Sequence, residues 1–199
     1  MKPELPTTLQ EPAALRALEA EARELGFSMS SDRPTGSLLR TLAASKPGGQ
    51  LLELGTGAGL GTAWLLDGMN ATAQLLTADQ DARVSAAAQR HLGQDRRVTF
   101  HVGDGGALLQ ALTDQGRRFD LIFADTWPGK FTHLDLALDL LARGGLYLVD
   151  DLHPQQNWPT DHAPKVPAFI AALEQRRDLR LTRLHWSTGL ILAARHDKT

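Results

Sequence analysis

Short apolar runs alternate with amphipathic stretches along the chain after residue 46. The run 119–124 is apolar apart from Asp120, which is typical of a strand that helices cover on both faces. Alternation of such runs with helical periodicity predicts βαβ units and a parallel sheet. We expect five parallel strands and a terminal antiparallel pair, at residues 50–54, 74–78, 98–102, 119–124, 146–149, 179–185 and 190–194.

Two helices are predicted before the first strand, over residues 11–25 and 33–44, because leucine and alanine recur on one face of each. Further helices are predicted between the strands, at residues 60–67, 82–92, 107–112, 134–141 and 169–174. Gly144-Gly145 is expected to end the helix over residues 134–141. The longest break is the polar loop at 150–164, and long loops in compact domains often carry function.

Composition narrows the classes of protein. The chain has 199 residues, which suits one domain, with N-terminal helices in residues 1–45 and a core in 46–199. A net charge of −2 argues against nucleic acid or an anionic membrane as partner. The absence of cysteine excludes thiolate metal sites and a cysteine nucleophile. No long apolar stretch and no apolar signal segment in residues 1–12 occur, so we expect a cytoplasmic location without membrane contact.

A glycine-rich segment joins the first predicted strand to its helix. It reads Glu53-Leu54-Gly55-Thr56-Gly57-Ala58-Gly59. Glycine lets the backbone turn sharply and lets a ligand approach closely. A dinucleotide site would need G-x-G-x-x-G, but Leu60 and Thr62 stand where its third glycine would fall. The acid at position 53 suits a ligand that carries a cation, such as an amino group or a sulfonium.

Acidic residues stand at the carboxyl ends of the other predicted parallel strands, the edge where doubly wound sheets bind ligands. Asp79 follows the second strand, where a carboxylate can accept both hydroxyls of a ribose. The other strand ends carry Gly103-Asp104, Asp125 and Asp150-Asp151. One such acid could be a simple helix cap. A set of acids at one edge favours a ligand site instead.

These segments, taken in order, resemble the motifs of class I S-adenosylmethionine-dependent methyltransferases. They are Glu53–Gly59, Leu75–Asp79, Val102–Asp104, Phe119–Asp125 and Gly144–Asp151. The leading helices with Asp125 and Asp150-Asp151 resemble the small-molecule O-methyltransferases of the catechol and caffeoyl-CoA type. The resemblance implies a doubly wound, Rossmann-like α/β fold whose seven-stranded mixed sheet has the order 3-2-1-4-5-7-6 with strand 7 antiparallel.

The same resemblance implies a site for S-adenosylmethionine. The residues it assigns to the cofactor are Glu53, Gly55, Thr56, Gly57, Gly59, Asp79, Gly103, Asp104 and Asp125. Glu53, Gly55 and Gly57 would line the methionine end. Asp79 would hold the ribose and Asp104 would lie near the adenine. Asp125 would lie below the sulfonium and the substrate.

The chain departs from this family at the expected metal site and at the expected base. Metal-dependent members pair the strand-four Asp with Asp-Asn, whereas this chain has Asp125 with Asp150 and Asp151. Three carboxylates could still bind Mg²⁺, which would hold a substrate hydroxyl and lower its pKa. The metal role of these residues stays an open prediction.

The family's catalytic lysine falls at Pro128 in this chain. Lys130, two residues further on, and His153 are the alternative candidates for the base. Either could instead be an ordinary surface or loop residue. Trp127 and Trp158 could wall an aromatic substrate pocket next to this centre.

The leading hypothesis is therefore an enzyme that methylates an oxygen of a small molecule, for which an aromatic ring is one option. Alternatives are an N-, RNA- or protein-methyltransferase of the same fold and a cofactor-binding protein without catalysis. A nicotinamide-dependent oxidoreductase is disfavoured by the missing third glycine. The sequence does not name the substrate, and it leaves open whether the protein is a monomer or a homodimer.

Overall fold

The computed structural model describes residues 10–196, so most of the segment 1–12 that was searched for a signal lies outside the described residues. The helices and strands alternate as expected for βαβ units. In chain order they are α1 (Leu15–Glu24), α2 (Arg33–Ala44), β1 (Gln50–Leu54), α3 (Leu60–Gly68), β2 (Gln74–Asp79), α4 (Ala82–Leu92), β3 (Val98–Val102), α5 (Gly105–Asp114), β4 (Phe119–Ala124), α6 (Leu134–Asp139), β5 (Leu141–Val149), η1 (Ala163–Lys165), α7 (Val166–Glu174), β6 (Leu179–Leu184) and β7 (Leu190–Arg195).

The strands form one sheet in the order β3-β2-β1-β4-β5-β7-β6. β1 pairs in parallel with both β2 and β4, and β7 pairs antiparallel with β5 and β6. The expected strand number, order and antiparallel strand are therefore confirmed. From β1 the chain adds strands first on one side (β2, β3) and then on the other (β4, β5), so the strand order reverses between β1 and β4. A doubly wound sheet binds its ligands at the carboxyl edge beside such a reversal.

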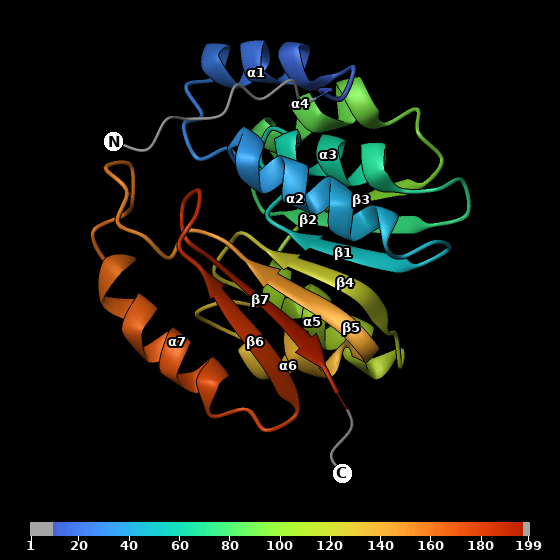
Figure 1. The fold of residues 1–199 in the computed structure, drawn as a ribbon. Coiled ribbons are helices and arrows are strands. Elements are labelled where there is room, and N and C mark those ends of the chain that lie inside the picture. The colour runs from blue at the N-terminus through green and yellow to red at the C-terminus, as the bar shows by residue number, and fades with distance from the viewer. Residues whose placement is uncertain (1–9, 197–199) are drawn as a thin grey trace.

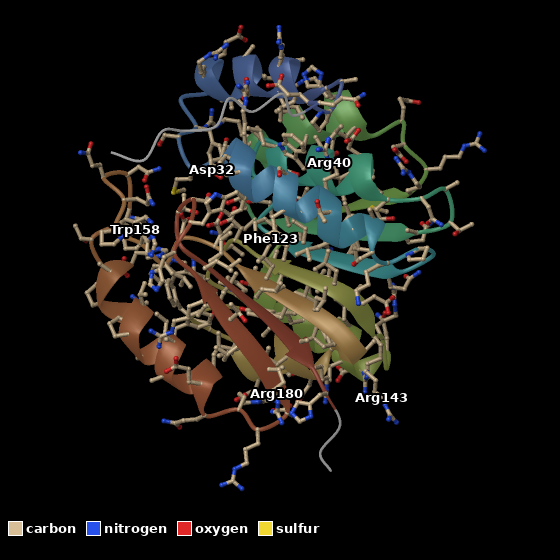
Figure 2. All side chains as sticks on the ribbon, viewed as in Figure 1. Asp32, Arg40, Phe123, Arg143, Trp158 and Arg180 are labelled. Atoms are coloured by element: carbon tan, nitrogen blue, oxygen red, sulfur yellow. The ribbon has the colours of Figure 1, made fainter. Side chains whose placement is uncertain are left out.

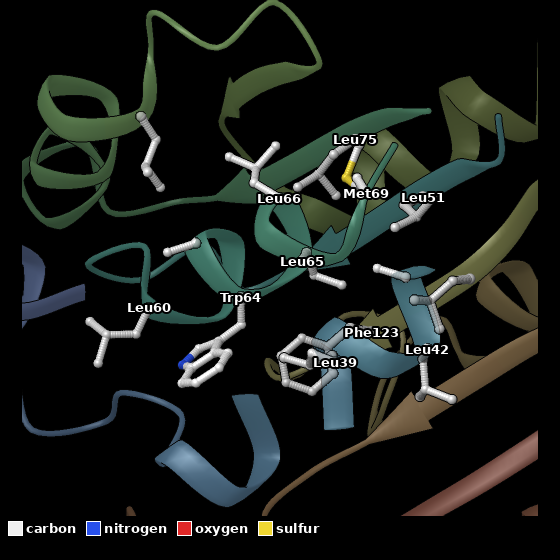
Figure 3. Packing of buried hydrophobic residues seen from close by; sticks show 14 of the residues in the cluster. Leu39, Leu42, Leu51, Leu60, Trp64, Leu65, Leu66, Met69, Leu75 and Phe123 are labelled. Carbon is white, nitrogen blue, oxygen red and sulfur yellow. The ribbon is translucent and has the colours of Figure 1, made fainter. Parts of the chain in front are cut away.

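Helices cover both faces of the sheet (Figure 1). Side chains of α1 to α4 form one apolar cluster with one face of the sheet, and side chains of α5 to α7 form a second cluster with the other face. Neighbouring residues of β1 alternate between the two, since Leu51 belongs to the first and Leu52 to the second. Trp64 lies buried in the first cluster, near Leu39 and Leu65 (Figure 3).

The connection from α6 to β5 differs from the sequence prediction. The helix ends at Asp139, and β5 begins at Leu141 rather than at residue 146. Gly144-Gly145, expected to end the helix, lies inside the strand, where the register with β4 shifts. A Cβ at Gly145 would lie 2.8 Å from the carbonyl oxygen of Ala142 and 2.9 Å from that of Phe119. The two glycines therefore allow a bulge, which their pattern alone does not distinguish from a helix end.

Two polar contacts hold the N-terminal segment against the end of the sheet. Asp32 caps α2 by accepting a hydrogen bond from the backbone N–H of Thr35 at 2.8 Å. The same carboxylate accepts from the hydroxyl of Ser187, in the turn between β6 and β7, at 2.6 Å. This contact fixes the start of α2, and with it the preceding residues that line the site. No helix within residues 10–196 is long and apolar enough to cross a membrane.

Candidate active site

A cavity of about 280 Å³ lies at the carboxyl edge of the sheet. Its walls come from five segments that are far apart in sequence: residues 27–31, the glycine loop after β1, residues 79–81 at the end of β2, the loop after β4, and the loop after β5. Asp32 and Trp158 lie at this end of the molecule, whereas Arg143 and Arg180 lie toward the opposite end (Figure 2). The site is therefore assembled where the sheet topology predicts it.

The glycine loop brings two strand ends together. Gly55 has φ +106°, and a Cβ there would lie 2.8 Å from the carbonyl oxygen of Asp125, at the end of β4. A Cβ at Gly57 would lie 3.0 Å from the ring of Phe27. Gly55, Thr56 and Gly57 all line the cavity. Gly59 instead packs against α4, since its Cβ would lie 2.6 Å from that of Ala88.

Asp79 is fixed by backbone donors at the end of β2. Its two oxygens accept hydrogen bonds from the N–H of Gly57 at 2.7 Å and the N–H of Asp81 at 2.9 Å. Each oxygen keeps a second acceptor site. Asp79 lines the main cavity and also a pocket of about 30 Å³ that includes Gly103. The carboxylate is thus positioned for the pair of ribose hydroxyls that the sequence suggested.

Asp104 has a different local role. It is exposed, and its side chain caps α5 by accepting from the N–H of Ala107 at 2.7 Å. Gly103 and Gly105, on either side of it, line the small pocket next to Asp79. The structure therefore brings the backbone beside Asp104 to the site, while its carboxylate is engaged in the helix cap.

Glu53 lies behind the glycine loop and is fully buried. Its Oε2 accepts hydrogen bonds from the hydroxyls of Thr62 at 2.5 Å and Thr77 at 2.6 Å. Its Oε1 has no partner within the described part of the chain. Burial raises the pKa of this carboxyl to about 7. Gly61, which lines the cavity, lies against the unpaired oxygen, because a Cβ there would be 2.5 Å from Oε1.

Lys130 is 2% exposed and lines the cavity together with Asp125. A tight turn presents it inward, with the N–H of Lys130 and of Phe131 both donating to the carbonyl of Trp127, at 3.0 and 2.9 Å. Burial lowers the pKa of the Lys130 ammonium, and the negative charge of Asp125 opposes that shift. Burial, followed by the negative charges of Asp150 and Asp151, raises the pKa of Asp125 well above its usual range.

The carboxylates predicted to hold a metal are engaged with protein donors. Asp125 accepts from the hydroxyl of Ser31 at 3.0 Å. Asp150 is buried and accepts from the hydroxyl of Thr188 and from the N–H of Asp151 at 2.7 Å. Burial, followed by the charge of Asp151, raises the pKa of Asp150 to about 6.

Within residues 10–196 no three acidic or histidine side chains are grouped so that they could hold a metal ion. A buried lysine also shares this part of the cavity. Asp125, Asp150 and Asp151 line a common cavity next to the main one, but they are not grouped as the ligands of a metal ion, and no step of the chemistry below uses a cation.

The two histidines of the loop after β5 occupy different places. His153 stacks on His185 with ring centroids 5.4 Å apart, beside the β6–β7 turn, and it is absent from the described lining of the cavity. His162 is 5% exposed and lines the cavity, and its Nε2 lies 3.1 Å from the carbonyl oxygen of Asp151. The structure thus brings Lys130, but not His153, to the predicted centre.

Aromatic rings form one wall of the cavity. Trp127 and Trp158 line it, as the sequence suggested. His162 joins them, stacked on Trp158 at 4.1 Å between ring centroids and edge-on to Phe131 at 4.8 Å. Sequence reasoning missed His162 and Ser31. The signal for His162 is its position in the long polar loop, and the signal for Ser31 is its place just before the predicted helix over residues 33–44.

This fold and this arrangement define a class I S-adenosylmethionine-dependent methyltransferase. A family described as "Methyltransferase domain" matches residues 52–152, and the chain belongs to it. The predicted family, fold and cofactor are thereby confirmed.

Curated relatives give the same result. A "Catechol O-methyltransferase" from Niastella koreensis is 30% identical over 148 residues, covering 71% of this chain and 67% of the relative. A relative from Mycolicibacterium vanbaalenii is 29% identical over 147 residues, covering 71% of this chain and 64% of the relative. The matched parts thus span about two thirds of the length of these two relatives.

Solved structures are similar over almost the whole chain. The O-methyltransferase TomG from Streptomyces achromogenes, in complex with SAM, has a TM-score of 0.83 at 25% identity, covering 96% of this chain and 92% of its own. An O-methyltransferase from Bacillus cereus in complex with SAH also has a TM-score of 0.83. It is 19% identical, and the match covers 95% of this chain and 93% of its own. The second similarity supports the fold alone.

The residues present fit S-adenosylmethionine. The glycine loop has no Cβ at Gly57, and Asp79 retains acceptors for ribose hydroxyls. The cavity carries Asp125 and Asp151 on its walls, with the unpaired Glu53 oxygen behind Gly61. A sulfonium and an ammonium are the charges that such a negative lining attracts.

Proposed function

We propose that the protein transfers a methyl group from S-adenosylmethionine to a hydroxyl oxygen of a small molecule. The observation that carries this proposal is the position of Lys130, a buried amine on the wall of the cavity that also contains the glycine loop and Asp79. A hydroxyl must lose its proton to become a strong nucleophile, and an amine freed from water at this point can accept that proton.

The acceptor we propose is small and at least partly aromatic. Trp127, Trp158 and His162 supply flat faces on one side of the cavity. Such faces favour planar rings. Burying a planar ring between aromatic side chains contributes more binding free energy than burying a flexible chain of equal size. The net charge of −2 supports a small molecule over an RNA substrate, because RNA binding relies on neutralising phosphates.

Lys130 and the cavity walls perform the chemistry that the protein must supply. Burial lowers the pKa of Lys130, so that its neutral amine can take the hydroxyl proton. The resulting ammonium remains next to the oxygen and stabilises its negative charge in a site largely without water. When bound, S-adenosylmethionine supplies an electrophilic methyl group and a neutral thioether leaving group. The walls hold the acceptor in line, and such alignment accounts for much of the rate of a direct displacement.

The test is methyl transfer from labelled S-adenosylmethionine to a panel of phenols, catechols and matched amines, with products identified by mass spectrometry. We expect methyl ethers from the phenols or catechols, and little product from amines. Methylation confined to the amines would contradict transfer to oxygen. Cofactor binding without any product would instead favour a binding protein that lacks catalysis.

A further inference from the structure

We propose that this methyltransferase needs no divalent cation, because the buried Lys130, once it has taken the acceptor's hydroxyl proton, supplies the positive charge beside the reacting oxygen. The inference rests on the proposed function of the same cavity and specifies how that cavity holds its substrate. Lys130 interacts electrostatically with Asp125, Asp150 and Asp151, the three carboxylates that would otherwise serve as metal ligands.

The first argument is that two of these carboxylates, Asp125 and Asp150, are already engaged with protein donors. Asp125 accepts from Ser31 at 3.0 Å, and Asp150 accepts from Thr188 and from the next residue's backbone N–H. A cation that took these oxygens would have to displace neutral donors that the fold holds in place. The grouping of three acidic or histidine side chains that a metal requires does not occur in the described residues.

The second argument is that the lysine is fixed in the site. The loop that carries it is closed by hydrogen bonds to the carbonyl of Trp127, and the hydroxyl of the buried Tyr147 donates to the carbonyl of Gly129 at 2.6 Å. Lys130 itself is 2% exposed, so its ammonium cannot move out to solvent without opening this loop. A divalent cation placed beside it would meet a positive charge that water does not screen.

The third argument is that the ammonium is free to bind an acceptor. Within residues 10–196 Lys130 has no ion pair shorter than 4.0 Å and no side-chain hydrogen bond, and its Nζ lies 5.1 Å from the centroid of the Phe131 ring. Its three donors can therefore point at a substrate oxygen. The side chain provides charge and donors without a strong competing partner.

This arrangement has a consequence for substrate choice. A divalent cation can ligate two neighbouring oxygens at once and so selects vicinal diols. An ammonium is a compact single charge that needs only one oxygen. We therefore expect a phenol with a single hydroxyl to be methylated with a kcat/KM within about threefold of that of the corresponding catechol.

The experiment compares this matched pair of acceptors with the enzyme before and after exhaustive treatment with EDTA. We expect kcat/KM for both acceptors to be unchanged by the chelator. Lys130→Met should lower kcat/KM by about 100-fold or more, the range for removal of a general base. Lys46→Met is the control, because Lys46 donates to the carbonyl of Gly144 and does not line the cavity.

A measurement on the wild-type protein without substrate gives a second readout. Mn²⁺ is titrated into the protein, and its free-ion signal is followed by electron paramagnetic resonance. We expect the free signal to persist at one equivalent of protein. Loss of one equivalent that Asp150→Asn abolishes, or activity that EDTA removes and Mg²⁺ restores, would overturn the inference while leaving the proposed function standing. Failure to methylate either acceptor with or without Mg²⁺ would overturn the proposed function itself.

Discussion

Glu53 shows how one side chain can serve both the core and the site. It is fully buried, yet its carboxyl group receives hydrogen bonds from only two hydroxyls and keeps one unpaired oxygen among the described residues. Burial of a charged carboxylate without a cation is costly, and the pKa of about 7 expresses that cost. A cofactor carrying positive charge beside Gly61 would offset part of it.

The first prediction concerns the pH dependence of stability. The folded-state pKa of Glu53 lies above its unfolded value of 4.5, so unfolding releases a proton and stability falls as pH rises from about 4.5 through about 7. The full effect is about 3 kcal/mol. Glu53→Gln should remove the Glu53 contribution and make the slope shallower, while the part that Asp125 and Asp150 contribute through their own raised pKa values remains. Chemical denaturation of both proteins at a series of pH values, without cofactor, measures it. Parallel profiles for the two proteins would contradict the assignment.

The second prediction concerns the ribose contact of Asp79. Asp79→Ala should weaken binding of S-adenosylhomocysteine by about 10- to 100-fold, because a hydrogen bond to a charged group is worth about 1.5–3 kcal/mol. The control is Asp114→Ala, since Asp114 is an exposed acid at the end of α5 that accepts only from Gln110. Calorimetric titration of both variants gives the affinities. Equal affinities would exclude a cofactor role for Asp79.

At the scale of the elements, acids at strand ends have two roles that sequence does not separate. Asp81 and Asp104 follow β2 and β3 closely and cap α4 and α5. Asp79 lies in the same kind of position but lines the cavity. The sequence predicted Asp79 and Asp104 alike as cofactor residues, because both stand at the ligand-binding edge. The direction of each side chain depends on the turn that follows the strand, which composition does not specify.

The third prediction separates a simple cap from a cap that also joins elements. Asp104→Ala removes one capping bond and should cost about 1 kcal/mol of unfolding free energy. Asp32→Ala should cost more, about 2 kcal/mol, because it also removes the acceptor of the Ser187 hydroxyl in the β6–β7 turn. Urea denaturation compares the two. Equal losses would mean that the contact between α2 and the turn contributes nothing.

Much of the fold could be predicted because its signals are local. The apolar period located the strands, and the family resemblance supplied their order. The clearest error is at Gly144-Gly145, where a bulge and a helix end share one pattern. The first helix also begins at Leu15 rather than at residue 11. The site was predicted less completely. His162 enters the cavity and His153 does not, although both belong to one loop. His162 enters the cavity because its ring packs against Phe131 and Trp158, and only the folded chain brings these rings together.

At the scale of the whole molecule, the cavity joins parts of the chain that the sheet holds at one edge. The segment before α2 touches the loop after β5 through a hydrogen bond from the Asn157 side chain to the carbonyl of Ser28, at 2.8 Å. The glycine loop and the end of β4 complete the enclosure. Residues 79–81 at the end of β2 also line it, so a ligand that fills this cavity contacts five segments and should stabilise the folded state as a unit. At 100 times its Kd, a ligand that binds only the folded state adds about 2.7 kcal/mol.

The most direct test of the central claim is calorimetric titration of the wild-type protein with S-adenosylhomocysteine, together with thermal unfolding in its presence. We predict saturable binding with one ligand per chain and, at 100 times the Kd, a rise in Tm of about 5–10 °C. NAD at the same concentration should give neither effect, because the glycine loop lacks the dinucleotide spacing. The absence of both heat and thermal shift with S-adenosylhomocysteine and with S-adenosylmethionine would contradict the account.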